Sequence, residues 1–347
     1  AGRDPRHVGR PLQLMKTAWE DIVGQNEPKR RLLRLLTADR LPHALLFTGP
    51  KGIGKCRTAE ALAGALLCTN PENGRPCGGC ASCRALARDI HPDFFRVEPE
   101  AVGKGARSIR IEPMRALMAA LSQPPETAPR QVVILDDVDR MNEPAANSFL
   151  KTLEEPSGAV VFILVTSARA ALLDTIVSRC LEIPFAPLLD AELYEIMRRH
   201  EIPEEARRDL AALAEGSAGR ALALYAGGAL ERRAEVLRLL PRIPELSPLE
   251  LLAEGKRLGE LSREEAGDWL RFLRLALRDL LALYGGVLPS GGASLGLTAL
   301  AERFLEARAF QMLAAATEAE RRLYGSNANI RLLMEALLLR LRGPVEG

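Results

Sequence analysis

The sequence lacks long apolar runs, an excess of charge of one sign, and aromatic residues. No uninterrupted run of about eighteen or more apolar residues occurs, so no transmembrane helix is expected. The 47 basic residues nearly balance the 45 acidic ones, and a net charge of +2 gives no evidence for a basic nucleic-acid-binding face. Aromatic residues make up only 4% of the sequence, while Leu, Ala, Glu and Arg dominate its second half. We therefore expect the second half to be mostly helical.

The first fourteen residues also lack the apolar segment of a signal peptide, and we expect residues 1–14 to be a disordered leader that takes no part in the fold. The chain of 347 residues is longer than one hydrophobic core usually supports, which predicts two or three domains. Four of the six cysteines lie between Cys68 and Cys83 at spacing typical of a metal site. Such use of cysteine is expected in a reducing compartment, which indicates a cytoplasmic protein.

Five short apolar segments in the first half predict the strands of a parallel sheet. Their lack of strict alternation is expected when helices cover both faces of the sheet. The predicted strands lie within His43–Gly49, Asp93–Glu98, Gln131–Asp137, Ala159–Ser167 and Cys180–Phe185. Helical patterns lie between them at Lys55–Cys68 and Asn142–Glu155, the second with Asn142 as its predicted N-cap. Strands that alternate with helices favour an α/β domain.

The strand signals end after Phe185, and the pattern of the remaining sequence is helical. Two or three short helices are expected from Asp190 to about Gly227, and Leu-rich helices with apolar residues three and four apart follow. Gly285–Gly296 is predicted to be a flexible connection between two of them. The expected domains are an α/β domain at 15–187, a small helical domain at 188–228 and a C-terminal helical bundle at 229–347.

The stretch "GPKGIGKC" nearly matches the phosphate-binding loop pattern G-x-x-x-x-G-K-[ST]. It follows a predicted strand and precedes a predicted helix, which is the context that the pattern requires. Backbone N–H groups of such a loop bind the phosphates of ATP or ADP, and the lysine reaches the terminal phosphates. A glycine-rich turn without a ligand is the alternative. The candidate nucleotide-binding residues are Gly49, Gly52, Gly54, Lys55 and Cys56.

Two positions in this predicted site carry unusual residues. Cys56 stands where the pattern has a hydroxyl that binds Mg²⁺, and because a thiol is a poor ligand for this ion we expect Mg²⁺ to bind badly. Asp136 ends a predicted strand where a metal-supporting acid belongs, and Asp137 follows where ATPases of this kind carry a glutamate. Misplacing a catalytic group by about 1 Å can cost about a hundredfold in rate, so hydrolysis should be slow. Alternatively, these acids only cap a turn.

The cysteine cluster has the spacing C-x8-C-x2-C-x2-C, formed by Cys68, Cys77, Cys80 and Cys83. Two-residue gaps place successive sulfur atoms around one tetrahedral ion, and four thiolates form a closed structural Zn²⁺ site without an open position for catalysis. Buried thiols without a metal are the alternative. Because the cluster follows the helix after the phosphate loop, residues 68–83 are predicted to be a zinc module inserted in the α/β domain, which the ion helps to fold.

Together these motifs resemble the subunits of the bacterial DNA polymerase III clamp loader, an AAA+ assembly, and within it the delta-prime type. The resemblance extends from about Met15 to the end of the sequence, and the combination of motifs is far more specific than any one of them. It is carried by the four cysteines and by "DIVGQ", "LPHALLFTGPKGIGK", "HPDFF", "VVILDDVDRMNEPAANSFLKTLEEP", "FILVTSARAALLDTIVSRC", "GSAGRAL" and "NANIRLLMEALLLRL".

The resemblance implies an AAA+ P-loop domain, a helical lid domain and an all-α collar in one subunit of a hetero-pentamer with gamma/tau and delta subunits. This assembly opens a sliding clamp and places it on primed DNA, with ATP at subunit interfaces. Arg179, in "SRC", is then an arginine finger whose permanent charge offsets negative charge on the nucleotide of a neighbouring subunit. An exposed surface arginine is the alternative.

Three departures indicate the delta-prime type rather than the ATP-hydrolysing gamma/tau type: Cys56, Asp137, and Gly219 in place of a nucleotide-sensing arginine. Arg220 follows one residue later, which turns its side chain by roughly 100° around the helix. Thr166 lies at a strand end where the family keeps a polar sensor, although its hydroxyl equally fits a cap of the next turn. Thr166 and Arg220 complete the candidate nucleotide contacts.

Two other functions stay open at this point. The first is a gamma/tau-type motor that tolerates both substitutions and hydrolyses ATP, where the delta-prime interpretation expects passive binding of ATP or ADP. The second is a nucleic-acid-binding zinc ribbon, against which the cysteine region has no interleaved aromatics and only Arg75, Arg84 and Arg88 nearby.

Overall fold

A computed structural model describes most of the chain and divides it into two compact units. One unit comprises residues 1–196 with 215–220, and the other comprises 197–214 with 221–347. Of the predicted leader 1–14, only His7–Val8 are among the described residues, so the leader and the domain boundaries stay predictions. The described residues are 7–8, 18–101, 107–156, 158–286, 297, 300–301, 305–325 and 328–343.

The first unit is built on a parallel sheet, and all five strands predicted from the sequence are confirmed. A short sixth strand, β1, pairs with β3 at the edge, and the order is β1-β3-β4-β5-β2-β6. Every pair of neighbours is parallel. The strands are β1 His7–Val8, β2 Ala44–Thr48, β3 Phe94–Val97, β4 Gln131–Leu135, β5 Val160–Thr166 and β6 Leu181–Pro184.

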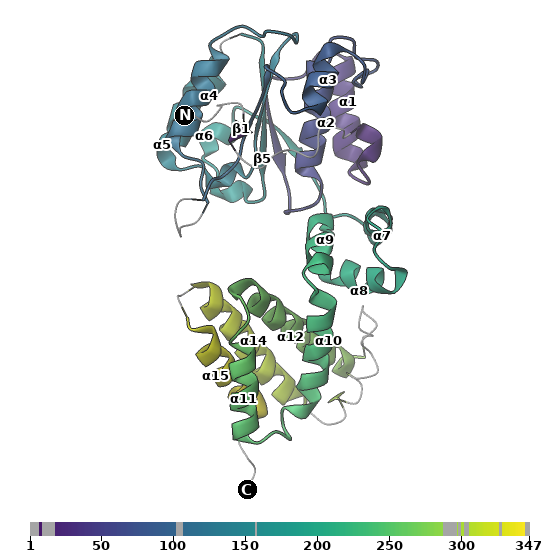
Figure 1. Ribbon diagram of the computed structural model, residues 1–347, viewed down its shortest axis with the longest axis vertical. Helices are drawn as coiled ribbons and strands as arrows, with labels where there is room; N and C mark the ends of the chain where they lie inside the picture. The colour runs from purple at the N-terminus through teal and green to yellow at the C-terminus, as the bar shows by residue number, and fades with distance from the viewer. Residues whose placement is uncertain are drawn as a thin grey trace. The chain divides into compact units, whose positions relative to one another are not determined.

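Helices cover both faces of this sheet, which explains why the strands are apolar on both sides (Figure 1). Alternate residues of β2 enter different cores: Leu45 packs with the helices α1, α2 and α3, while Leu46 packs with α4, α5 and α6. The helices are α1 Asn26–Thr37, α2 Lys55–Leu67, α3 Ala81–Ala87, α4 Ile111–Leu121, α5 Glu143–Glu154 and α6 Asp174–Val177, with 3-10 turns η1 Trp19–Asp21, η2 Val138–Arg140 and η3 Arg169–Ala171.

Two local predictions on these helices are confirmed. The side chain of Asn142 accepts a hydrogen bond from the backbone N–H of Ala145 at 3.0 Å, so it is the N-cap of α5. The helix after the phosphate loop begins at Lys55, directly beyond the C-terminal end of β2. Since the C-terminal ends of parallel strands meet at one edge of the sheet, the loop after β2 lies beside the ends of β4 and β5.

The elements described after β6 are all helices, as predicted. Helix α11 packs on α15 and α12 packs on α14, while Ser247 and Ser262 begin α11 and α12 with reciprocal capping boxes. The helices are α7 Asp190–Arg199, α8 Glu204–Ala214, α9 Ala218–Ala226, α10 Ala229–Leu239, η4 Leu240–Arg242, α11 Pro248–Leu258, α12 Arg263–Tyr284, α14 Glu306–Gly325 and α15 Ile330–Arg342.

Of the predicted connection Gly285–Gly296, only Gly285 and Gly286 are among the described residues. None of the helices in the described ranges is long and apolar enough to cross a membrane.

Candidate functional site

The phosphate loop has left-handed backbone angles at its three glycines, with φ of +137° at Gly49, +76° at Gly52 and +104° at Gly54. Only glycine adopts such angles without strain, and they let the backbone curl in front of α2. The side chain of Lys55 is buried and turns back onto the loop, where its Nζ donates to the carbonyl oxygens of Gly49 at 2.7 Å and Pro50 at 2.6 Å. Burial lowers the pKa of Lys55. The predicted phosphate lysine therefore binds its own loop in this structure.

A buried cluster centred on Arg96 of β3 lies beside Cys56. Nη2 of Arg96 donates to Cys56 Sγ at 3.1 Å and to Asp136 Oδ2 at 3.4 Å, while Nη1 donates to Glu60 Oε1 at 2.7 Å. Nε of Arg96 lies 2.5 Å from Glu98 Oε1. The side chains of Arg96 and Glu60 are only 12% and 3% exposed, so both charges are largely removed from water. Each therefore requires the opposite charge of the other to offset the cost of burial.

The protonation states in this cluster follow from burial and from the cation. Burial raises the pKa of the Cys56 thiol well above its usual value, so the sulfur is a neutral thiol near neutral pH. Burial also raises the pKa of Glu60, although Arg96 opposes this effect. Burial acts to lower the pKa of Arg96, but the carboxylates of Glu98, Glu60 and Asp136 outweigh it, so the pKa is raised and the guanidinium stays charged. A neutral thiol and an arginine do not fit Mg²⁺, which needs oxygen ligands and no adjacent cation.

The carboxylates after β4 have different partners. Asp136 accepts a hydrogen bond from the backbone N–H of Asp137 at 3.0 Å through Oδ1. Asp137 has a left-handed φ of +45°, and its Oδ2 lies 3.7 Å from Nζ of Lys51 and 3.9 Å from Nε of Arg140. The side chain of Asp137 makes no capping hydrogen bond to η2. Both acids thus lie at the predicted edge of the sheet, engaged with cations of the chain itself.

Thr166, at the end of β5, is fully buried and its hydroxyl has two partners. It donates to Asp139 Oδ1 at 2.6 Å and accepts from the backbone N–H of Ala168 at 3.0 Å. In this structure the hydroxyl therefore stabilises the turn after β5.

The start of α9 lies directly against the phosphate loop. The backbone N–H of Gly219 donates to the carbonyl of Gly52 at 2.9 Å, and Ser217 Oγ donates to the carbonyl of Lys51 at 2.8 Å. Ser217 Oγ also accepts from the backbone N–H of Arg220, so it is the N-cap of α9. The guanidinium of Arg220 pairs with Glu215 at 2.9 Å. Arg220, a candidate nucleotide contact, thus pairs with an acid of its own segment.

Arg179 follows α6 and is 34% exposed. Its guanidinium donates to the carbonyl of Thr175 at 2.8 Å and forms an ion pair with Glu154 at the end of α5. Neither partner belongs to the phosphate loop of the same chain. The structure thus brings together most of the predicted nucleotide-site residues and leaves Arg179 outside that group.

The four predicted zinc ligands converge. Their Sγ atoms all lie within 4.8 Å of one another, and those of Cys68 and Cys80 are 3.9 Å apart. Tetrahedral Zn²⁺ with Zn–S distances of about 2.3 Å sets sulfur atoms about 3.8 Å apart, so the arrangement fits a structural Zn²⁺. Backbone N–H groups of Cys77, Cys80 and Cys83 each donate to the sulfur of the preceding cysteine at 3.3–3.4 Å, which favours thiolates.

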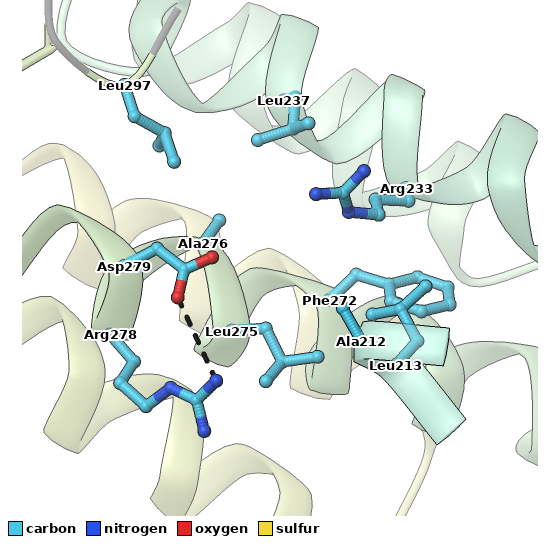
Figure 2. Close-up of a pocket in the computed structure, with 10 residues that line it drawn as sticks. All are labelled: Ala212, Leu213, Arg233, Leu237, Phe272, Leu275, Ala276, Arg278, Asp279 and Leu297. Atoms are coloured by element: carbon cyan, nitrogen blue, oxygen red, sulfur yellow. Dashed lines mark ion pairs between the residues drawn. The ribbon is translucent and has the colours of Figure 1, made fainter. Parts of the chain in front are cut away.

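A separate cavity of about 110 Å³ lies in the helical unit, and none of the predicted site residues line it (Figure 2). Leucines and Phe272 form much of its wall, and Arg233 and Asp279 bring charge to it. Asp279 lies 3.8 Å from Arg278, and its carboxyl pKa is raised by burial. We assign no role to this cavity.

Similarity to known proteins identifies the family to which this chain belongs. A family model described as DNA polymerase III, delta subunit, matches residues 24–189. The DNA polymerase III subunit delta-prime of Pseudomonas aeruginosa is 40% identical over 214 residues, which cover 60% of this chain and 64% of that protein. The corresponding subunit of Bacillus subtilis is 30% identical over 349 residues, which cover 94% of this chain and 99% of that protein. The chain belongs to the delta-prime subunit family of DNA polymerase III.

The delta-prime family is also related to a larger subunit. The tau subunit of DNA polymerase III from Escherichia coli is 33% identical over 78% of this chain, but the match covers only 45% of tau. The resemblance inferred from the motifs is thereby confirmed at the level of the family.

In this member of the delta-prime family, sequence analysis missed two residues that organise the site. Arg96 is the only charged residue in the apolar run "FFRV", and a charge in the middle of a predicted buried strand was a signal that it has a buried partner. Gln25, next to the left-handed Gly24, donates to the carbonyls of Ile53 and Ala186 at 3.1 Å and 2.7 Å. No local pattern predicts those long-range contacts.

Proposed function

We propose that this chain is a clamp-loader subunit of the DNA polymerase III holoenzyme whose role is assembly and activation in trans. It joins a hetero-pentamer with gamma/tau and delta subunits, and it supplies Arg179 to the nucleotide of a neighbouring ATPase subunit. The assembly then loads a sliding clamp onto primed DNA in the cytoplasm, while the P-loop of this chain hydrolyses little or no ATP.

The observation that carries this proposal is the contrast between Arg179 and the chain's own P-loop. Arg179 is partly exposed, and it is held by Glu154 and a carbonyl rather than by the phosphate loop. An arginine held in this way is available to a second subunit. In the P-loop, by contrast, Lys55 donates hydrogen bonds to the backbone of the loop itself. The guanidinium of Arg96 lies beside Cys56.

Binding of ATP or ADP at this P-loop remains a separate prediction. The glycine angles support it, because they suit a loop that wraps phosphate oxygens. The contact between Gly219 and Gly52 argues for weak binding, because it holds the start of α9 against the loop. In either case the nucleotide is a passive ligand in this proposal.

Exposed apolar side chains on the C-terminal helices support a role in assembly. On α14 Phe310 is 56% exposed, and on α15 Leu332 is 64% exposed. Exposed large apolar side chains on two helices that pack together are candidate contacts with another protein. We therefore assign the collar role implied by the family resemblance to these helices.

The test is reconstitution of the loader with Arg179→Ala. The complex should still form, because the ion pair of Arg179 with Glu154 is exposed and such pairs contribute little to stability. An arginine finger is worth about 10³–10⁵ in rate at its site, so turnover at the facing site should be almost abolished and clamp loading should fail. The measurements are co-purification of the subunits, ATP turnover stimulated by clamp and primed DNA, and clamp loading.

A matched control is Arg169→Ala, which removes another partly exposed arginine of the same segment, paired with Glu182. This variant should retain nearly normal turnover and loading. Full loading activity in an assembled complex that carries Arg179→Ala would refute the proposed finger.

The gamma/tau-type motor is the second candidate, because tau is 33% identical to this chain and the P-loop glycines are intact. It requires ATP turnover by the isolated chain. A nucleic-acid-binding zinc ribbon has less support, since Arg75 pairs with Glu20 and Arg84 bonds to the carbonyl of Gly79 within the chain.

A further inference from the structure

The position of one guanidinium nitrogen in the P-loop site suggests what replaces the metal. In P-loop proteins that hydrolyse nucleotide, Mg²⁺ is held by the hydroxyl after the loop lysine and by the acid at the end of the neighbouring strand. Here these positions are Cys56 and Asp136. A single atom, Nη2 of Arg96, lies 3.1 Å from Cys56 Sγ and 3.4 Å from Asp136 Oδ2. The guanidinium of Arg96 therefore lies between the two residues at the positions that hold Mg²⁺ in those proteins.

The surroundings of Arg96 account for its charge. Two further acids, Glu60 from α2 and Glu98 just after β3, lie at 2.7 Å and 2.5 Å from its other nitrogens. Glu60 is nearly fully buried, and a buried acid of this kind is stable only with a cation nearby. Arg96 itself is fixed by the strand that carries it, at the register where it pairs with Ile134 of β4. The guanidinium is thus held in place by three carboxylates and by the strand that carries it.

We propose that Arg96 is a built-in substitute for the divalent cation of this P-loop, which completes the site without Mg²⁺ and keeps Mg²⁺ out of it. The inference concerns this chain's own P-loop and holds whether or not Arg179 acts in trans. It differs from an ordinary buried ion pair in one respect. Removing the guanidinium must expose a set of ligands, the carboxylates of Asp136, Glu60 and Glu98, that suits a hard divalent cation.

The test uses the full zinc-loaded chain and Mn²⁺ as the probe, with binding followed by the electron paramagnetic resonance of free Mn²⁺. The wild-type chain should bind no Mn²⁺ at this site, and its thermal midpoint should not respond to Mg²⁺ at matched ionic strength. Arg96→Met should have a lower midpoint in chelator and should gain one Mn²⁺ site, at least about tenfold tighter than any site of the wild type. Mg²⁺ should raise its midpoint.

The matched control is Arg233→Met. Arg233 is 14% exposed and pairs with Asp209 at 2.7 Å, so it resembles Arg96 in burial and charge, but within the described residues its ion pair is with one carboxylate and no thiol. This variant should lose stability without gaining a Mn²⁺ site. Equal Mn²⁺ binding by both methionine variants would show that the loss of any buried arginine suffices, and would overturn the assignment.

A second variant guards against misfolding of Arg96→Met. Arg96→Met with Glu60→Gln removes one cation and one buried acid together, so the net charge of the cluster is kept while Asp136 and Glu98 remain as ligands. It should also bind Mn²⁺. Three results would overturn the proposal: wild-type chain that binds Mn²⁺ as tightly as the variants, folded variants that bind none, or failure of both variants to fold, which marks Arg96 as a structural residue only.

Discussion

At the scale of single residues, Gly52 of the P-loop lies in close contact with the residues that begin α9. A Cβ atom built on Gly52 would lie 2.4 Å from Ser217 Oγ and 3.2 Å from the backbone of Gly219. Gly52 also has a φ of +76°, where a side chain is strained. Two features of the structure therefore require glycine at this position: the left-handed backbone of the phosphate loop and the close approach of the start of α9.

Gly52→Ala should therefore destabilise the chain more than strain alone explains. The control is Gly158→Ala, with a similar φ of +82° and no atom of the described residues within 4 Å of the added Cβ. Both changes carry the cost of a left-handed alanine, about 1–2 kcal/mol. Crowding should add about 1–3 kcal/mol at Gly52 only, measured as the difference in the free energy of unfolding in urea. Equal losses would mean that α9 does not rest on the loop in solution.

At the scale of elements, a buried hydrogen-bond chain fastens the zinc module to the P-loop helix. The backbone N–H of Asp93 donates to Nδ1 of His91 at 3.0 Å, so the ring proton is on Nε2. Nε2 lies 2.7 Å from Ser82 Oγ, and this hydroxyl donates to the carbonyl of Leu67 at the end of α2. Burial lowers the pKa of His91, which keeps the ring neutral. Helix α3, the end of α2 and the start of β3 are thereby joined.

Ser82→Ala should break this connection and leave the Nε2–H of His91 buried without a partner. Such a loss costs about 1–3 kcal/mol. Ser122→Ala is the control, because the Ser122 hydroxyl is exposed and donates to the carbonyl of Ala119, three residues earlier. It should change the free energy of unfolding by about 0.5 kcal/mol or less. An unaltered stability in Ser82→Ala would show that the zinc module is held by its ligands alone.

At the scale of the whole molecule, the features predicted from sequence are those encoded over short stretches. The strands were predicted because parallel strands buried on both faces are continuous apolar runs, as in "VVFILVT" of β5. The zinc cluster was predicted because its four ligands lie within sixteen residues. Contacts between distant segments were not predicted, such as Arg96 with Cys56 and Gly52 with Gly219, because no local spacing encodes them.

These contacts between distant segments determine whether restoring the usual P-loop residues would restore ATP hydrolysis. Cys56→Ser with Asp137→Glu restores the hydroxyl and the longer acid, and a gamma/tau-type motor would respond with ATP turnover. We expect none, because Arg96 still lies against Asp136, and Lys55 still donates to the carbonyls of its own loop. Turnover of the isolated wild-type chain and of the double variant, with and without DNA, should equal that of Lys55→Ala, which sets the background. Turnover stimulated by DNA in either protein would instead assign the motor function to this chain, because hydrolysis requires an ordered metal and a positioned water in the same site.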